Sequence, residues 1–189
     1  MKTRPKDLVH RLLKEHRVMA IATNRPDGWP HATMVNYVAD GFLLYCFIAR
    51  GSQKHTNIRR DPRVSISVGT DALRPLDIKG LSAAGRASIV TDQSEFEHVV
   101  ALRRKRFPEY AALPPPVVRE GALQRIAPEP SPAGVVLLRI EPEIISVLDY
   151  SKGFGHSDLI TFSERDLDLH VQTLRHEWNG SSKASDSSS

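Results

Sequence analysis

The chain has 189 residues, of which 40% are hydrophobic and 25% charged, a composition typical of one globular domain with a sizeable core. Acidic residues alternate with the cations, so the formal net charge is only +4 and the pattern argues against a nucleic-acid-binding protein. The densest basic cluster, Leu102–Arg106, is interpreted as the solvated face of a helix.

The single cysteine, Cys46, excludes an intramolecular disulfide and a multi-cysteine metal site. The first residues lead into a charged helical pattern rather than the apolar core of a signal peptide, and no apolar run is long enough to cross a bilayer. The sequence therefore predicts a cytoplasmic protein with no membrane partner.

The chain opens with a predicted amphipathic helix over Asp7–Arg17, where three leucines share one face. A short strand over Val18–Thr23 follows, and the turn residues of Asn24–Gly28 connect it to a second strand over Pro30–Ala39. Both faces of this second strand are expected to be buried.

The next strand is predicted over Phe42–Ile48, after a hairpin turn at Asp40-Gly41. A short helix over Ser52–Arg60 comes next, and it is followed by a strand over Val64–Val68 with one buried face. A longer strand over Ile78–Val90 contains two glycines, which indicate bulges or a close backbone approach.

The longest predicted helix covers Ser94–Phe107, with its first residue as the N-cap. Leu113–Pro132 is rich in proline and is expected to be a long surface loop. Two final strands are predicted over Val135–Ile140 and Ile144–Tyr150, separated by a break at Pro142.

Six or seven strands joined mostly by tight turns, with only two clear helices, favour a mainly β (α+β) fold. The prediction is an antiparallel barrel with peripheral helices rather than a parallel sheet. The expected organisation is an N-terminal helix (1–16), a barrel domain (17–150), a C-terminal extension that packs on the barrel or on a second copy (151–179), and a disordered serine-rich tail (180–189).

The stretch Arg50–Arg63 is the predicted functional site. Gly51 ends a strand and Ser52 is a good N-cap, so Lys54 lies in the first turn of a helix. Free amides at a helix N-terminus, beside a hydroxyl and an ammonium, form an anion site that phosphate commonly occupies. The alternative is an ordinary capped surface helix with solvated cations.

Other common signatures are absent from the sequence, which contains no Gly-rich phosphate loop, zinc-type histidine pair or nucleophile elbow at diagnostic spacing. Three histidines, His31, His55 and His156, stand beside a strand or turn that could line a cleft. None of them has the spacing of a metal ligand, and no catalytic residue is assigned.

Five motifs occur in a recognisable order. They are Asp27-Gly28-Trp29-Pro30, Asp40-Gly41-Phe42-Leu43-Leu44-Tyr45, Ser52-Gln53-Lys54 with Asn57, Asp61-Pro62-Arg63-Val64-Ser65, and Gly85-Arg86-Ala87. Together they resemble the flavin-binding split-barrel proteins of the pyridoxamine 5′-phosphate oxidase superfamily. The resemblance covers about Arg17 to Asp149 and implies a split β-barrel of six or seven strands.

The resemblance also implies a homodimer with FMN in a groove between the subunits. By position, Lys54 and Ser52-Gln53 would bind the flavin phosphate, and Arg50 would supply a charge that the oxidase has at the position of Gln53. The residues implied for the cofactor are Thr33, Met34, Val35, Asn36, Ile48, Arg50, Ser52, Gln53, Lys54 and Asn57.

The favoured function is an FMN-dependent oxidoreductase of unknown substrate, in which the flavin carries the electrons. A dedicated pyridoxamine 5′-phosphate oxidase is not expected, because Phe107–Leu113 and the C-terminal segment lack the substrate-phosphate motifs of that enzyme. The alternatives are a reductase that uses the deazaflavin F420, a non-catalytic flavin-binding protein, and a haem-binding or haem-degrading protein. Gly153-Phe154-Gly155 resembles a motif of the haem-handling members, and the loop Tyr150–Asp158 is expected to close one edge of the cofactor site.

Overall fold

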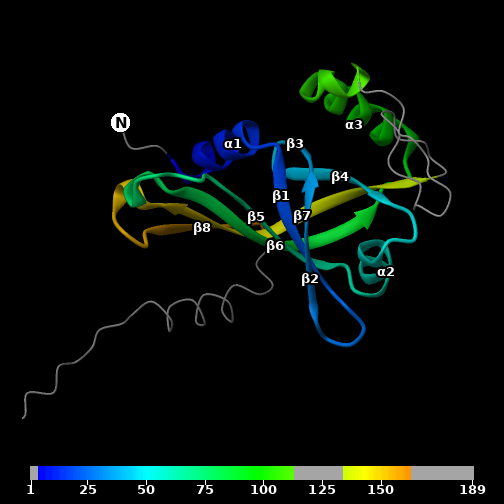
Figure 1. Ribbon diagram of the computed structural model, residues 1–189, viewed down its shortest axis with the longest axis horizontal. Coiled ribbons are helices and arrows are strands. Elements are labelled where there is room, and N and C mark those ends of the chain that lie inside the picture. Colours follow the sequence, from blue (N-terminus) through cyan, green and yellow to red (C-terminus); the bar gives the residue numbers. More distant parts are fainter. Residues whose placement is uncertain (1–3, 113–133, 163–189) are drawn as a thin grey trace, which may run out of the picture.

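The computed structural model describes residues 4–112 and 134–162, which form an eight-stranded antiparallel sheet curled into a half-barrel with three α-helices around it (Figure 1). The strands are β1 (Val18–Asn24), β2 (Pro30–Asn36), β3 (Val38–Asp40), β4 (Leu43–Ala49), β5 (Arg63–Gly69), β6 (Lys79–Ile89), β7 (Val135–Asp149) and β8 (Ser157–Thr161). The helices are α1 (Pro5–Glu15), α2 (Gln53–Arg60) and α3 (Gln93–Arg106), with three short 3-10 turns, η1 (Pro75–Asp77), η2 (Pro108–Ala112) and η3 (Tyr150–Lys152). The predicted split-barrel class is confirmed.

The strand order is β2-β1-β5-β6-β7-β4-β3. One edge of the long strand β7 pairs with β6, and its other edge pairs first with β4 and then with β8. Although β2 and β4 are far apart in this order, they contact each other, so the sheet curls until these two strands meet. The inner face of this curl holds the main core, to which α1 contributes four buried apolar residues.

Helix α3 packs on the other side of β4 and β7, over a second, smaller core (Figure 1). Two arginines of the predicted solvated cluster face inward there, which corrects that interpretation. Arg103 lies over the rings of Phe47 and Tyr110, and Arg106 donates to the Leu13 carbonyl at 2.8 Å, near the end of α1. Only the neighbouring Arg104 and Lys105 are exposed. Cation–π contacts and a helix-end hydrogen bond therefore join α3 to α1 and β4.

A single strand, β7, replaces the two strands predicted on either side of Pro142. The strand continues because the ladder between β6 and β7 shifts register at Ala84/Gly85, directly opposite this proline. A bulge interrupts the ladder of backbone hydrogen bonds locally, so Pro142, which has no N–H, does not have to donate one at this point. Gly85 is required there, because a Cβ at this position would lie 2.3 Å from the Glu141 carbonyl oxygen.

Three other predictions need correction. The predicted strand Pro30–Ala39 is interrupted at Tyr37, whose buried hydroxyl donates to the Leu13 carbonyl at 3.1 Å. Its first part, β2, is an edge strand with no fully buried residue, so the expectation that both faces are buried is wrong. Asp92, rather than Ser94, caps α3 by accepting from the Glu95 amide at 2.7 Å.

Some predictions lie outside the described residues, namely the proline-rich loop after residue 112, the C-terminal extension beyond residue 162 and the serine-rich tail. The first residues of the expected extension form η3 and β8, and β8 belongs to the main sheet. No helix within 4–112 and 134–162 has both the length and the apolarity needed to cross a membrane.

The Gly85→Ala variant is expected to be less stable by at least about 1–3 kcal/mol, because the added methyl group clashes with backbone that cannot rotate away. Urea denaturation measures the difference. Gly69→Ala is the matched control, because the nearest atom to its Cβ, the Lys79 carbonyl oxygen, would lie at an ordinary 3.6 Å. Equal midpoints for the two variants would show that Gly85 is not needed for the bulge.

Candidate functional site

The junction between β4 and α2 is formed by the predicted site sequence. Gly51 has φ +77°, a left-handed conformation that favours glycine, and it turns the chain from the strand into the helix. Ser52 is the N-cap, as predicted, and its hydroxyl accepts from the His55 amide at 3.3 Å. The first turn of α2 contains no acidic residue, so its remaining amides are available to an anion.

His55 stabilises this turn rather than facing a ligand. Its Nδ1 accepts from the Gly51 amide at 3.1 Å, and the residue is buried. Burial, together with the nearby cations of Arg59 and Arg50, lowers the pKa of His55 and favours the neutral ring that this hydrogen bond requires.

Asn57 connects α2 to the β1–β2 hairpin. It is completely buried, and its Nδ2 donates to the Thr23 hydroxyl at 2.9 Å. Thr23 in turn donates to the His31 carbonyl at 3.4 Å, and the Gln53 amide donates to Asn57 Oδ1 at 2.8 Å. Of the predicted cofactor residues, Asn57 therefore uses its side chain to fix the helix on the barrel, and Gln53 supports Asn57 from within the helix.

Lys54 is the predicted site residue with the most unusual surroundings. It is partly buried, and burial is the main cause that lowers its pKa. Its ammonium lies close enough to the Cys46 thiol for each group to affect the pKa of the other. Among the residues that the structure describes, Lys54 forms no ion pair. A partly desolvated cation without a carboxylate partner at a helix N-terminus is suited to bind an anion.

The four predicted cofactor residues of β2 do not share one face. Thr33 and Val35 pair with core residues of β1, so their side chains face the barrel interior. Met34 and Asn36 face the other way and are exposed. A ligand on the inner side can therefore meet the side chains of only the first two.

The inner side of β2 contacts β4, and α2 packs against β1 and β4. We call this region the barrel mouth. It is defined by His31, Thr33, Cys46, Ile48 and Lys54. Cys46 and Ile48 are buried in the main core, so they form an apolar floor, and Ile48 offers a ligand only apolar contact. Arg50 is exposed at the start of the turn into α2. The mouth thus combines one cation, helix amides, two polar side chains of β2 and an apolar base.

Sequence reasoning did not assign Thr23 or His31 to the site. Thr23 was read only as the end of a strand, and its role depends on a contact with Asn57, 34 positions along the chain. His31 was noted as well placed, but its register opposite Thr23 puts it on the same inner face as Thr33. Alternation along β2 could have indicated that face once the pairing with β1 was known.

Comparison with known families decides the relationship. A sequence profile described as pyridoxamine 5′-phosphate oxidase matches residues 5–148, which is most of the chain. The chain belongs to this family. The matched range contains α1, α2, all strands from β1 to β6 and nearly all of β7. A search of curated proteins finds no match.

Solved structures share the fold at low sequence identity. A candidate pyridoxamine 5′-phosphate oxidase from Listeria innocua is 24% identical, with a TM-score of 0.58 over 77% of this chain and 99% of that one. A haem storage protein from Vibrio cholerae is 19% identical, with a TM-score of 0.56 over 84% and 95%. An FAD-binding protein from Mesorhizobium loti is 24% identical, with a TM-score of 0.52 over 73% and 89%. These similarities establish the architecture.

The single cysteine gives a direct test of the barrel mouth. Burial raises the pKa of the Cys46 thiol to about 12, so almost none of the thiol is ionised at pH 8. We expect a thiol reagent such as Ellman's reagent to leave the folded protein almost unmodified at pH 8 and to react with one thiol per chain in urea. Rapid stoichiometric reaction of the folded protein would contradict this buried position.

Proposed function

We propose that this protein binds FMN at the barrel mouth and acts as an FMN-dependent oxidoreductase. The carrying observation is Lys54, a partly buried cation without an ion-pair partner among the described residues, in the first turn of a helix capped by Ser52. The helix amides and the ammonium would bind the phosphate, and the apolar floor would pack against the flat or hydrocarbon parts of the ligand. The flavin would supply the redox chemistry, and the chain would bind and orient it.

Arg50 is the proposed second cation. Gln53, which stands where the oxidase has a cation, is neutral and donates to Asn57, so it adds no charge for the phosphate. Arg50 is exposed and lies two positions before the N-cap Ser52, at the same end of α2 as Lys54. We propose that its guanidinium contributes to the same anion site from the solvent side.

Pyridoxamine 5′-phosphate is not the proposed substrate. The oxidase has a substrate-binding tyrosine after its long helix, and Tyr110 is the tyrosine of the corresponding region here. Its ring is stacked on Phe107 with 5.2 Å between centroids. Arg103 covers the same ring at 4.9 Å. A tyrosine held in this cluster is not presented to a substrate phosphate. The C-terminal segment that would carry the family's second phosphate motif lies outside the described residues.

Two other cofactors use parts of the same site. F420 also carries an anionic end, to which the Lys54 ammonium would bind. F420 is therefore an alternative ligand of the same site. A haem storage protein is among the structural neighbours, but haem needs an axial ligand. In this chain the Nδ1 of His55 accepts a backbone hydrogen bond. His55 is thus engaged through Nδ1, whereas Nδ1 of His31 has no hydrogen-bond partner among the described residues, so haem stays the alternative ligand.

A homodimer is proposed because one face of the sheet is uncovered. The outward residues of β2, β1 and β5 are small or flexible, and most of them are exposed. They are Ala32, Met34, Asn36, Ala20, Ala22, Ser65 and Ser67. With β2 as a free edge, this face has the properties of a surface that pairs with a second copy.

The buried single thiol suits the cytoplasm proposed as its compartment.

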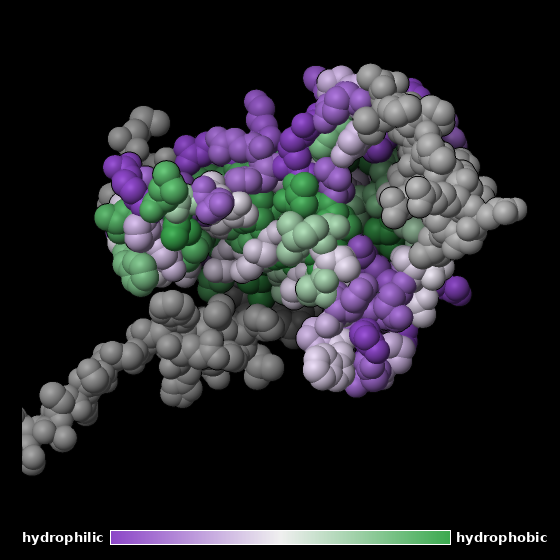
Figure 2. Space-filling view, in the orientation of Figure 1, coloured by the Kyte–Doolittle hydropathy of each residue, from purple (hydrophilic) through white to green (hydrophobic). Residues whose placement is uncertain are grey.

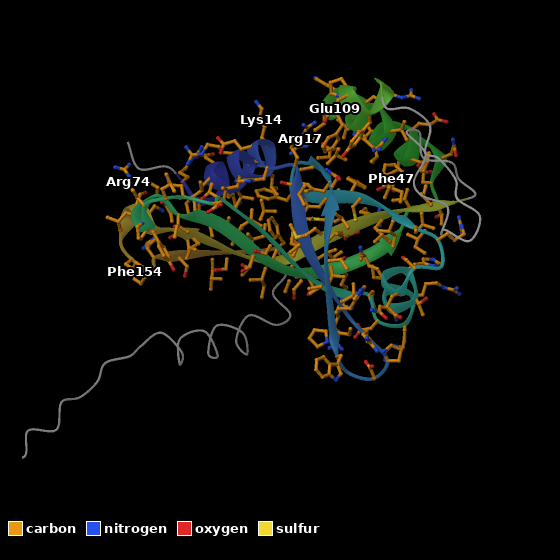
Figure 3. All side chains as sticks on the ribbon, in the orientation of Figure 1. Lys14, Arg17, Phe47, Arg74, Glu109 and Phe154 are labelled. Atoms are coloured by element: carbon orange, nitrogen blue, oxygen red, sulfur yellow. The ribbon has the colours of Figure 1, made fainter. Side chains whose placement is uncertain are left out.

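The loop around Phe154 would reach a cofactor site only on the partner. The residues from η3 to β8 form a tight hairpin, in which Phe154 is exposed and contacts Tyr150 with 4.9 Å between centroids. This hairpin lies at the end of the sheet opposite α2 (Figures 1 and 3). Apolar side chains gather at the same end in Figure 2. The turn η1, which contacts η3, contains the exposed Leu76 and follows the exposed Leu73. We propose that this end of one subunit covers the flavin of the other.

Replacing Lys54 tests the phosphate contact. Lys54→Ala removes a charge-assisted contact, so FMN affinity should fall by about ten- to a hundredfold. Riboflavin has no phosphate, and its affinity should change little. Fluorescence titration of the protein with each flavin measures both constants. Lys14→Ala, at an exposed lysine of α1, is the matched control and should bind both flavins like the wild type.

Equal losses for FMN and riboflavin, or no loss for FMN, would show that Lys54 does not bind the phosphate. If the wild type binds neither flavin but retains F420 or haem, that molecule replaces FMN as the proposed ligand.

Replacing Phe154 tests the contribution of the partner. Phe154→Ala should weaken FMN and riboflavin to a similar extent, because a flat aromatic side chain would contact the ring rather than the phosphate. Lys14→Ala, at the exposed lysine of α1 used as the control above, should leave both affinities unchanged. Sedimentation analysis should give twice the chain mass for both variants. Unchanged flavin binding in a dimeric Phe154→Ala protein would mean that this hairpin lies away from the site.

A further inference from the structure

Three large apolar side chains are exposed where η1 and η3 meet, and we call this surface the apolar end. Leu73 is fully exposed, and Phe154 and Leu76 are 78% and 56% exposed. The two turns contact each other, and the Tyr150 amide of η3 donates to the Ile78 carbonyl, directly after η1, at 3.1 Å. Apolar side chains are visible at this end in Figure 2. Exposed apolar side chains that gather in this way commonly mark a binding surface.

The cations of this region are paired with carboxylates. The pairs are Lys152–Asp158 at 2.7 Å, Arg74–Asp77 at 2.7 Å and Lys79–Asp149 at 3.9 Å. The side chains of Lys152 and Lys79 are only 25% and 28% exposed, whereas Arg74 is 82% exposed and lies at the same end as Phe154 in Figure 3. A ligand phosphate or carboxylate would have to displace a carboxylate of the protein to reach any of these cations. The apolar end is therefore poorly suited to an anionic ligand.

We propose that the substrate of the flavin site is uncharged and apolar, a proposal that rests on the function proposed above and on the placement of this end over the flavin of the partner. Two leucines and a phenylalanine favour a ligand whose apolar surface leaves water on binding. They do not replace the water that a phosphate or carboxylate would lose. The ring of Phe154 also offers a flat surface to an aromatic ligand. The substrate class is therefore a planar, uncharged molecule.

The test uses two quinones that differ by one charge. 1,4-Naphthoquinone is uncharged, and 1,4-naphthoquinone-2-sulfonate carries an anionic group on the same ring system. Equilibrium dialysis against the FMN-loaded protein in its oxidised state measures binding without turnover. We expect the wild type to bind naphthoquinone at least about tenfold more tightly than the sulfonate, because only the sulfonate has to lose water from a charge.

Variants of the two leucines test whether the apolar end makes this selection. Leu73→Ser and Leu76→Ser should each weaken naphthoquinone binding by about five- to tenfold, because each removes apolar surface that the ligand covers. Both side chains are exposed, so neither substitution disturbs the core. Lys14→Ala, at the exposed lysine of α1, is the control and should bind naphthoquinone like the wild type.

Asp77→Asn tests the role of the paired charges. It leaves the exposed Arg74 without its carboxylate, so the sulfonate should bind about two- to fivefold more tightly than to the wild type, while naphthoquinone binding stays the same. An equal gain for both quinones would contradict the account of charge, because the effect would then not depend on the sulfonate.

If the FMN-loaded wild type binds the sulfonate as tightly as naphthoquinone, the inference is wrong while the proposed function stands. The same conclusion follows if both leucine variants bind naphthoquinone like the wild type. Sedimentation of these variants as single chains would also overturn the inference, because the leucines would then bind the second copy instead. If the wild type binds no flavin, the proposed function itself fails and the inference fails with it.

Discussion

The buried hydrogen bond between Asn57 and Thr23 is the contact on which the site depends. It joins the second turn of α2 to the end of β1, and Thr23 extends the connection to β2 through the His31 carbonyl. Because both groups are buried, loss of either partner would leave the other unsatisfied inside the protein. This contact fixes α2 on β1, and in the proposed site it therefore sets the position of Lys54 relative to the barrel.

Local sequence signals predicted most of the fold. The cap at Ser52, the turn glycines and the alternation along β5 depend on neighbouring residues, and each was found where it was predicted. Pro142 was misread because its effect depends on a bulge at Gly85, a residue far away in the sequence. The arginines of α3 were misread because the aromatic rings beneath them come from β4 and η2. Long-range partners were therefore the missing information.

The candidate site was predicted less completely than the fold. The resemblance directs attention to the turn after β4, where the predicted cap at Ser52 is found. The split of β2 between two faces appears only after its pairing with β1 is known. Side-chain hydrogen bonds distinguish Gln53 and Asn57, which use their polar groups within the protein, from Lys54, which forms no ion pair among the described residues. The exposed hairpin between η3 and β8 lies opposite α2 in the half-barrel (Figure 1), which is why its proposed contact with the flavin involves a second chain.

The central claim is that the barrel mouth binds a flavin through its phosphate end. Its most direct test is to denature the purified protein and to identify the released small molecule by mass and absorption spectrum. The account predicts FMN, at one molecule per chain when the protein is saturated. Release of haem with a Soret band, or of a compound without phosphate, would contradict it.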